Sequence, residues 1–145
     1  MKILISSDHA GYKKKKQIIK FLNNYEVIDL GTNSENPVDY PDYAFELSKK
    51  IANKEADLGI LICATGIGMS IASNKVKKIR CAKIDNCKEA VCAKEHNNAN
   101  VIALSSKKSM FRIKRIINSF LSSNSSLEER HIRRIKKIED YENEF

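Results

Sequence analysis

The residues best suited to chemistry follow an apolar run, LGILI, at residues 58–62. The run is too short to cross a bilayer and is typical of a strand that is buried on both faces. The sequence CATGIGMS follows at residues 63–70, and residues 69–75 have the pattern of a helix. Main-chain N–H groups at such a strand–loop–helix junction are free to bind an anion. A thiol, two hydroxyl groups and these amides predict a site that stabilises a negatively charged small molecule or intermediate.

Two further polar residues, Asp8 and His9, follow a strand expected at residues 2–6. In an open parallel sheet, ligands bind beyond the carboxyl ends of the strands, near the point where the strand order reverses. We therefore expect Asp8 and His9 to meet the loop at residues 63–70 at one edge of the sheet. Asp8 has an alternative role as an Asx cap for the helix that follows it.

The alternation of strands and helices predicts the elements that position these residues. Alternating elements imply βαβ units, a parallel sheet and helices on both of its faces. The predicted fold class is α/β, a Rossmann-like three-layer α/β/α sandwich with a five-stranded parallel sheet and an extra C-terminal helix, in one domain over residues 1–145. Strands are expected at residues 2–6, 26–30, 58–62, 80–84 and 100–104, and helices at about residues 12–23, 41–53, 69–75, 86–96, 108–120 and 127–142.

Length and composition narrow the class of protein. The 145 residues suit a single domain with a hydrophobic core. No segment approaches the roughly 20 apolar residues that cross a bilayer, so we expect a cytoplasmic protein that does not bind a membrane. The cysteines lack CxxC spacing, which argues against a zinc site or a redox dithiol. Three of them lie in or next to apolar runs, which favours small core residues over disulfide partners. These cysteines are Cys63, Cys81, Cys87 and Cys92.

The formal net charge of +8 raises the question of a nucleic-acid partner. Lysine and arginine are spread along the predicted helices, and the densest run, at residues 13–16, fits a solvated helix face. We therefore expect no nucleic acid as partner, whereas a basic surface would still attract a phosphorylated metabolite. The glycine loop is neither GxGxxG nor a Walker loop, which argues against an NAD site and a nucleotide triphosphatase.

Several short motifs, taken together and in order, resemble a known family. They are SDHAG at residues 7–11, DLGT at 29–32, DYP at 39–41, GILICATGIG at 59–68, SIASNK at 70–75, HN at 96–97, NV at 100–101, and Arg130-His131 with Arg134. The chain resembles ribose-5-phosphate isomerases of the B type, a family shared with the galactose-6-phosphate isomerase subunits. The resemblance covers essentially the whole chain.

The resemblance implies interconversion of D-ribose 5-phosphate and D-ribulose 5-phosphate in the pentose phosphate pathway. A proton moves between C1 and C2 through an enediolate, without a metal or organic cofactor. Such a reaction needs a base, a group that opens the sugar ring, donors for the developing oxyanion and a cationic grip on the phosphate. A hexose phosphate, such as allose 6-phosphate or galactose 6-phosphate, is the alternative substrate.

Cys63 matches the base of the family. A thiol that faces main-chain amides can be held partly as thiolate, which is the form that abstracts a proton. The alternative is an inert cysteine that closes the strand. The resemblance also implies a cradle for the enediolate, although Thr65 and Ser70 have an alternative role as helix caps. The predicted cradle consists of Thr65 and the amides of Gly66, Ile67, Gly68, Met69 and Ser70.

His96 matches the residue that opens the furanose, and Asn97 matches a substrate contact. A histidine at a helix end has an alternative role as a partner for the helix dipole. The helix that starts near residue 86 runs back from the carboxyl edge of the sheet, so His96 is expected at the opposite edge from its own Cys63. We therefore predict a homodimer, which could pair into a tetramer, with composite sites to which the partner donates His96 and Asn97.

Other residues match the family's substrate contacts. Asp8 is expected to orient a sugar hydroxyl or assist ring opening, and His9 to touch the phosphate. Tyr43 stands where the family has an aromatic residue near the pocket, and core packing is its alternative role. Where the family usually has an arginine after the fifth strand, this chain has Lys107, which keeps the charge without the bidentate geometry.

Arg130 and Arg134 match the phosphate-binding arginines of the family, and His131 could join them. The two arginines lie one turn apart on the last helix, and two guanidinium groups suit phosphate geometry. Without the resemblance, this helix would be an ordinary exposed charged face, and the protein could be a sugar-phosphate sensor without catalysis. The two arginines are expected to flank an apolar stripe of Leu127, Ile135 and Ile138.

Overall fold

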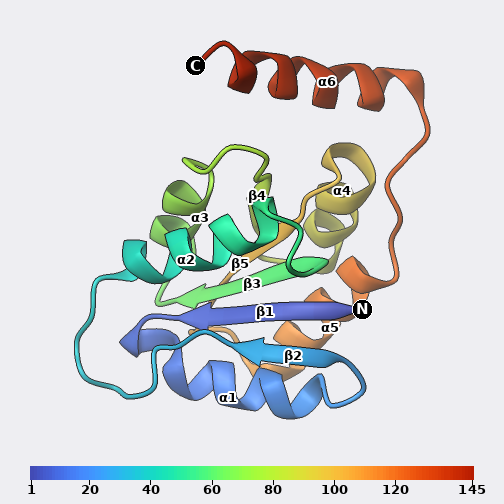
Figure 1. Ribbon diagram of the computed structural model, residues 1–145. Coiled ribbons are helices and arrows are strands. Elements are labelled where there is room, and N and C mark those ends of the chain that lie inside the picture. The colour runs from blue at the N-terminus through green and yellow to red at the C-terminus, as the bar shows by residue number, and fades with distance from the viewer.

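The computed structural model describes residues 1–145 and contains one five-stranded sheet in the order β2-β1-β3-β5-β4, with all neighbouring strands parallel (Figure 1). This confirms the predicted α/β class. The strands β3 and β5 lie inside the sheet and are buried at every position, which explains their continuous apolar sequences. The strands are β1 (Lys2–Ser7), β2 (Glu26–Asp29), β3 (Leu58–Cys63), β4 (Cys81–Lys83) and β5 (Val101–Ser105).

Helices cover both faces of the sheet. One apolar core joins the sheet to α1, α4 and α5, and a second joins it to α2 and α3, so the predicted three layers are confirmed. Most helix ends lie within two residues of the predicted positions. The helices are a 3₁₀ turn η1 (His9–Gly11), α1 (Tyr12–Phe21), α2 (Tyr40–Ala52), α3 (Ile67–Ser73), α4 (Cys87–Asn97), α5 (Met110–Leu121) and α6 (Glu129–Asn143).

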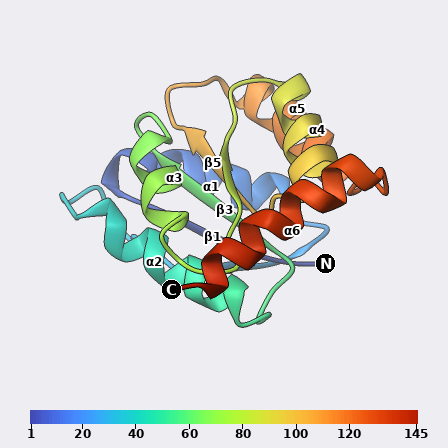
Figure 2. The same cartoon turned by 90° about the horizontal axis from the view of Figure 1, so that it is seen from above.

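The helix α6 lies outside these layers and crosses the edge of the molecule near α4 (Figures 1 and 2). The apolar stripe predicted for this helix is largely exposed in a single chain. Leu127 precedes the helix and is 89% exposed, and Ile138 is 44% exposed. The extra C-terminal helix is therefore present, but its apolar side chains do not form part of the core.

The strand order reverses between β1 and β3, which are neighbours although β2 separates them in the chain. Their register pairs Ser7 with Ile62, so the segments that begin at Asp8 and Cys63 leave the sheet side by side. This reversal is the place where open α/β sheets bind ligands. None of the helices is both long enough and apolar enough to span a bilayer.

All four cysteines are free thiols, but only Cys63 is buried. Cys81, Cys87 and Cys92 are half-buried, so the expectation that cysteines serve as core residues is met fully by Cys63 alone. Burial raises the pKa of the Cys81 thiol to about 11, and hydrogen bonds from Ser73 and Ser70 offset part of that effect. Cys81 is therefore a protonated packing residue at neutral pH.

Candidate active site

Cys63 is the last residue of β3 and is 5% exposed. The main-chain N–H of Gly66 donates a hydrogen bond to its sulfur at 3.1 Å, which fixes the thiol against the turn. Gly66 itself has φ +78°, and a Cβ atom there would lie 3.1 Å from the carbonyl carbon of Leu104. The turn therefore requires glycine both for its backbone conformation and for its contact with β5.

The turn leads directly into α3, which begins at Ile67, two residues earlier than predicted. The Thr65 hydroxyl accepts the N–H of Ile67 at 3.2 Å, but the cap residue of α3 is Gly66 and no side chain caps the helix, so the alternative role of Thr65 as a helix cap is wrong. The N–H of Ser70 bonds to the carbonyl of Gly66. Of the three residues between them, Ile67 is bonded to Thr65, and the N–H groups of the other two have no acceptor in the chain. These free donors belong to Gly68 and Met69. An anion beside Cys63 could accept both.

Met69 offers the site only its main-chain N–H, and the main-chain N–H of Ser70 is already bonded to Gly66. Met69 is fully buried in the core, so its thioether cannot reach a ligand. Ser70 lies inside α3, one turn beyond the start, rather than at its cap. The predicted alternative of Ser70 as a cap is therefore wrong, because the helix begins before it.

Asp8 and His9 lie on the neighbouring segment after β1. Asp8 is 7% exposed, and its Oδ1 accepts the N–H of Gly11 at 3.0 Å, so the alternative role as an Asx cap is observed. The Nδ1 atom of His9 accepts the N–H of Val38 at 3.2 Å. In the neutral ring the proton therefore lies on Nε2, which can donate to an oxygen of a ligand.

Two tyrosines of α2 approach glycines at this edge. A Cβ atom on Gly31 would lie 3.0 Å from the ring of Tyr43, and Gly31 accepts the N–H of Ser7. The ring of Tyr40 is closer still to Gly68, where a Cβ atom would lie 2.6 Å from its Cζ atom. Tyr43 was predicted near the pocket, whereas Tyr40 was assigned no role although it belongs to the DYP motif.

A cationic cavity of about 600 Å³ opens beside Thr65 and Ile67. Its basic side chains come from the end of β4, the segment after β5 and the first turn of α5, and they include the predicted Lys107. Asp85 pairs with Lys83 and, at 2.9 Å, with Lys108, and these hydrogen bonds hold the pKa of its carboxyl below its usual value. No role was predicted for Lys83, Asp85 and Lys108; the carboxyl ends of β4 and β5 were a signal for their location, though not for their pairing. The lining residues are Thr65, Ile67, Lys83, Asp85, Ser105, Lys107, Lys108, Ser109 and Arg112.

The remaining predicted site residues lie at the other edge of the sheet. The carbonyl of Asn97 accepts a hydrogen bond from Arg80, the residue before β4, whereas Cys63 is aligned with Ser105 at the end of β5. The five residues of β5 separate these edges by roughly 13 Å at about 3.3 Å per residue. A single chain therefore does not bring His96 and Cys63 together.

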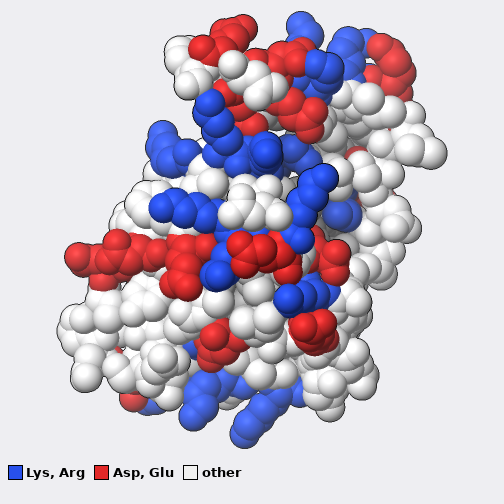
Figure 3. Space-filling view, in the orientation of Figure 1, with Lys and Arg blue, Asp and Glu red and all other residues white.

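His96 is close to the arginines of α6. Its ring stacks on His131 with 4.4 Å between the centroids. Burial lowers the pKa of His131, and the nearby charges of His96, Arg130 and Arg134 lower it further. The structure thus forms two groups, one around Cys63 and the other around His96. Figure 3 shows side chains of both signs over α6, and below it a group of basic side chains followed by a band of mainly acidic ones.

The family model described as Ribose/Galactose Isomerase matches residues 3–138. The chain belongs to the ribose/galactose isomerase family. A relative from Mycoplasma genitalium, named a probable ribose-5-phosphate isomerase B, is 45% identical over 148 residues, which cover 98% of this chain and 96% of the relative. The family resemblance inferred from the motifs is therefore confirmed.

Solved structures of the family agree with the fold. The ribose-5-phosphate isomerase B of Clostridium thermocellum has a TM-score of 0.96 and 41% identity, covering 99% of both chains. A structure of the Mycoplasma genitalium enzyme with bound ribulose-5-phosphate has a TM-score of 0.93 and 43% identity, covering 99% of this chain and 97% of that one. No group of three or more histidine, cysteine, aspartate or glutamate side chains is arranged to hold a metal ion.

Proposed function

We propose that this chain is an aldose–ketose isomerase that interconverts D-ribose 5-phosphate and D-ribulose 5-phosphate. The observation that carries the proposal is the position of the Cys63 sulfur at the turn that also presents the free N–H groups of Gly68 and Met69. A base and oxyanion donors at one point are what an enediolate reaction needs. The family membership and the ribulose-5-phosphate complex of the Mycoplasma genitalium enzyme support this choice of substrate.

In the proposed reaction, the Cys63 thiolate takes the proton from C2 of the open-chain aldose. The electron pair forms the C1–C2 double bond, and negative charge develops on the oxygen at C1. The N–H groups of Gly68 and Met69, with the Thr65 hydroxyl, stabilise this oxyanion. The Cys63 thiol then returns the proton to C1, while a proton moves from the oxygen at C2 to the oxygen at C1.

We propose that a second copy of the chain completes each site. His96 and Asn97 lie roughly a strand length from their own Cys63, which supports a role for them in the site of a different chain. His96 would open the furanose, and Asp8 would orient a sugar hydroxyl. Arg130 and Arg134 lie beside His96, so they would enter the site of the partner together with it.

The phosphate would be held by cationic groups from both chains. The guanidinium groups of Arg130 and Arg134 suit bidentate binding, and the Nε2 atom of His9 supplies a further donor. Lys107 lines the cationic cavity next to Thr65, where it adds charge without fixed geometry. Tyr43 would close the pocket over the Gly31 segment.

The test is the exchange of the C2 proton of ribose 5-phosphate with solvent deuterium, together with turnover to ribulose 5-phosphate. Wild type should show both, and Cys63→Ala and Cys63→Ser should lose kcat by several orders of magnitude with a much smaller change in KM. Wild type that leaves ribose 5-phosphate untouched, or a Cys63→Ala variant of full activity, would refute the proposal. The same assay on allose 6-phosphate and galactose 6-phosphate measures the preference, and we expect the higher kcat/KM for the pentose.

A further inference from the structure

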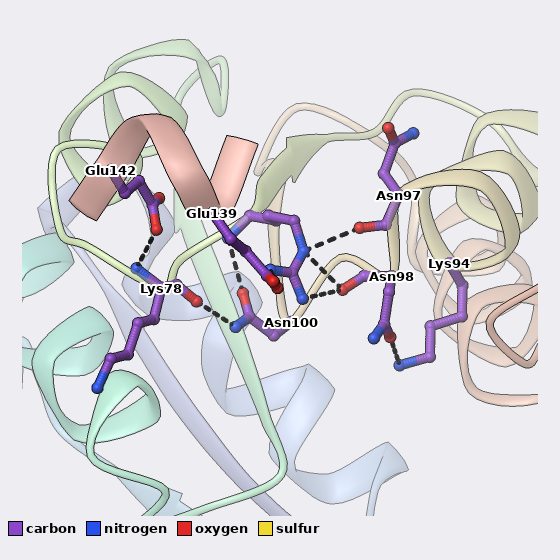
Figure 4. Close-up of polar contacts among 8 residues, drawn as sticks. Lys78, Lys94, Asn97, Asn98, Asn100, Glu139 and Glu142 are labelled. Atoms are coloured by element: carbon purple, nitrogen blue, oxygen red, sulfur yellow. Dashed lines mark hydrogen bonds and ion pairs between the residues drawn. The ribbon is translucent and has the colours of Figure 1, made fainter. Parts of the chain in front are cut away.

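Arg80 lies between α3 and β4 and has no part in the mechanism described above. Its side chain is 17% exposed, and it contacts the end of α4 on one side and α6 on the other. Figure 4 labels its partners Asn97, Asn98 and Glu139. The Nε atom donates to the carbonyl of Asn97 at 2.9 Å, and Nη2 donates to the carbonyl of Asn98 at 3.3 Å. The Nη1 atom pairs with Glu139 of α6 at 3.3 Å.

These contacts provide hydrogen-bond donors for main-chain carbonyl groups at the end of α4. The last carbonyl groups of a helix have no partner inside the helix, and a cation near them is favourable. Here α4 ends at Asn97, and the φ of +45° at the cap residue Asn98 turns the chain sharply out of the helix. A planar guanidinium that binds two successive carbonyls at this turn fixes the direction in which His96 and Asn97 are presented.

Neighbouring hydrogen bonds hold Arg80 itself in place. Its main-chain N–H donates to Oδ1 of Asn100 at 2.9 Å, and the amide of Asn100 donates to the carbonyl of Lys78 at 2.8 Å. The N–H of Lys78 donates to Glu142 of α6 at 3.0 Å (Figure 4). The segment before β4 therefore joins the end of α4 to the helix that carries the two arginines.

We infer that Arg80 is a positioning residue for ring opening, which it serves by fixing the His96–Asn97 segment relative to α6. The inference rests on the proposed function, because it requires His96 to open the furanose. Arg80 touches main-chain carbonyls rather than substrate. Its loss should therefore impair the step that needs His96 and spare the proton transfer at Cys63.

Two reactions separate these steps. Ribose 5-phosphate is mostly a furanose, and its turnover needs ring opening. Ribulose 5-phosphate cannot close such a ring, because its O5 carries the phosphate, so exchange of its C1 proton with deuterium oxide needs only the base and the oxyanion donors. The ratio of ribose 5-phosphate turnover to ribulose 5-phosphate exchange therefore reports on ring opening, and a loss of folded enzyme does not change it.

In Arg80→Met we expect ribose 5-phosphate turnover to fall by about 10- to 100-fold, the loss typical of a misplaced catalytic group, with exchange within about 3-fold of wild type. Arg80→Lys keeps the charge but not the paired contacts, so it should lower the ratio of turnover to exchange to a smaller extent. This variant provides the test if Arg80→Met does not fold. His96→Ala should show the same separation of the two rates. Arg133→Met, which breaks the exposed pair with Glu129 on α6, is the matched control and should leave both rates unchanged.

Parallel loss of turnover and exchange in the folded Arg80 variants would overturn the inference, as would no change in either rate. Wild type that catalyses neither reaction would instead refute the proposed function. If wild type catalyses both reactions and His96→Ala has the same two rates, His96 has no role in ring opening, and neither has Arg80.

Discussion

Gly66 has a main-chain conformation, φ +78°, that residues with a Cβ atom adopt only with strain. It also lies between Cys63, whose sulfur it hydrogen-bonds, and the main chain of β5. One residue thus sets the direction of both the base and the oxyanion donors. A substitution here should affect stability and chemistry together.

For Gly66→Ala we expect a loss of about 1–3 kcal/mol in the free energy of unfolding, because the left-handed conformation is strained and the new methyl group meets Leu104. The kcat for ribose 5-phosphate should fall more than KM rises, since the donors move away from the oxyanion. Urea unfolding and steady-state kinetics measure the two effects. A variant with wild-type stability would contradict the strain.

The residues after β1 and β3 could be placed together from the sequence, because carboxyl ends of parallel strands share one edge. The contacts of Tyr40 and Arg80 could not be predicted from the sequence, since they depend on how a helix or a turn packs against residues distant in the chain. Tyr40 meets Gly68, and Arg80 meets the end of α4, through distances that no local pattern encodes. The pairing of Asp85 with Lys108 was missed for the same reason.

At the scale of the elements, α1 is joined to β2 by a buried lysine. Lys15 is fully buried, so the solvated face predicted for residues 13–16 is wrong at this position, and its ammonium group contacts Asp29 at 2.5 Å and the carbonyl of Thr32 at 2.6 Å. Thr32 in turn pairs with Ser7, directly before Asp8. The lysine therefore supports the segment that presents Asp8 to the site.

Lys15→Met should lower the free energy of unfolding by about 2–4 kcal/mol, because it leaves Asp29 and a main-chain carbonyl without their partner. Lys13→Met is the matched control in the same helix. Lys13 pairs with Glu35 at 3.0 Å on the surface, so its loss should change stability by less than about 0.5 kcal/mol. Similar losses in the two variants would contradict the role of Lys15.

The docking of α6 on α4 should depend on pH through His131. Its pKa is lowered by burial and then by His96, so the folded protein binds a proton on it less readily than the unfolded chain. The contribution of His131 to the free energy of unfolding should be fully present above the ordinary histidine pKa of about 6.5 and should decrease as the pH falls below that value.

His131→Phe keeps a ring against His96 and removes the titration. The loss of unfolding free energy between pH 7.5 and pH 5 should be smaller in this variant than in wild type. Urea unfolding at a series of pH values measures it. An identical pH dependence in the two proteins would assign the effect to other groups.

The sequence placed the sheet, the three layers and the last helix correctly, because buried strands and amphipathic helices have clear periodicities. It did not show that the apolar residues of α6 stay exposed in one chain. Leu127 and Ile138 have the spacing of a buried face, and periodicity does not tell whether the covering surface belongs to the same chain.

At the scale of the whole molecule, the proposed composite sites make a mixing experiment decisive. Cys63→Ala and His96→Ala should each be nearly inactive alone. After unfolding and refolding together in equal amounts, they should recover about one quarter of wild-type activity, because half of the random dimers contain one site with both groups intact. Arg133→Met mixed with Cys63→Ala should show only the activity of its own sites. No recovery in the first mixture would contradict the division of each site between two chains.

The roughly 13 Å between the two edges of the sheet also bears on a newly made chain. Such a chain would contain every residue of the proposed site, but it would be inactive until it binds a second chain. Specific activity should therefore decline on dilution. The total chain concentration at which half of the activity is lost would equal the dissociation constant of the dimer.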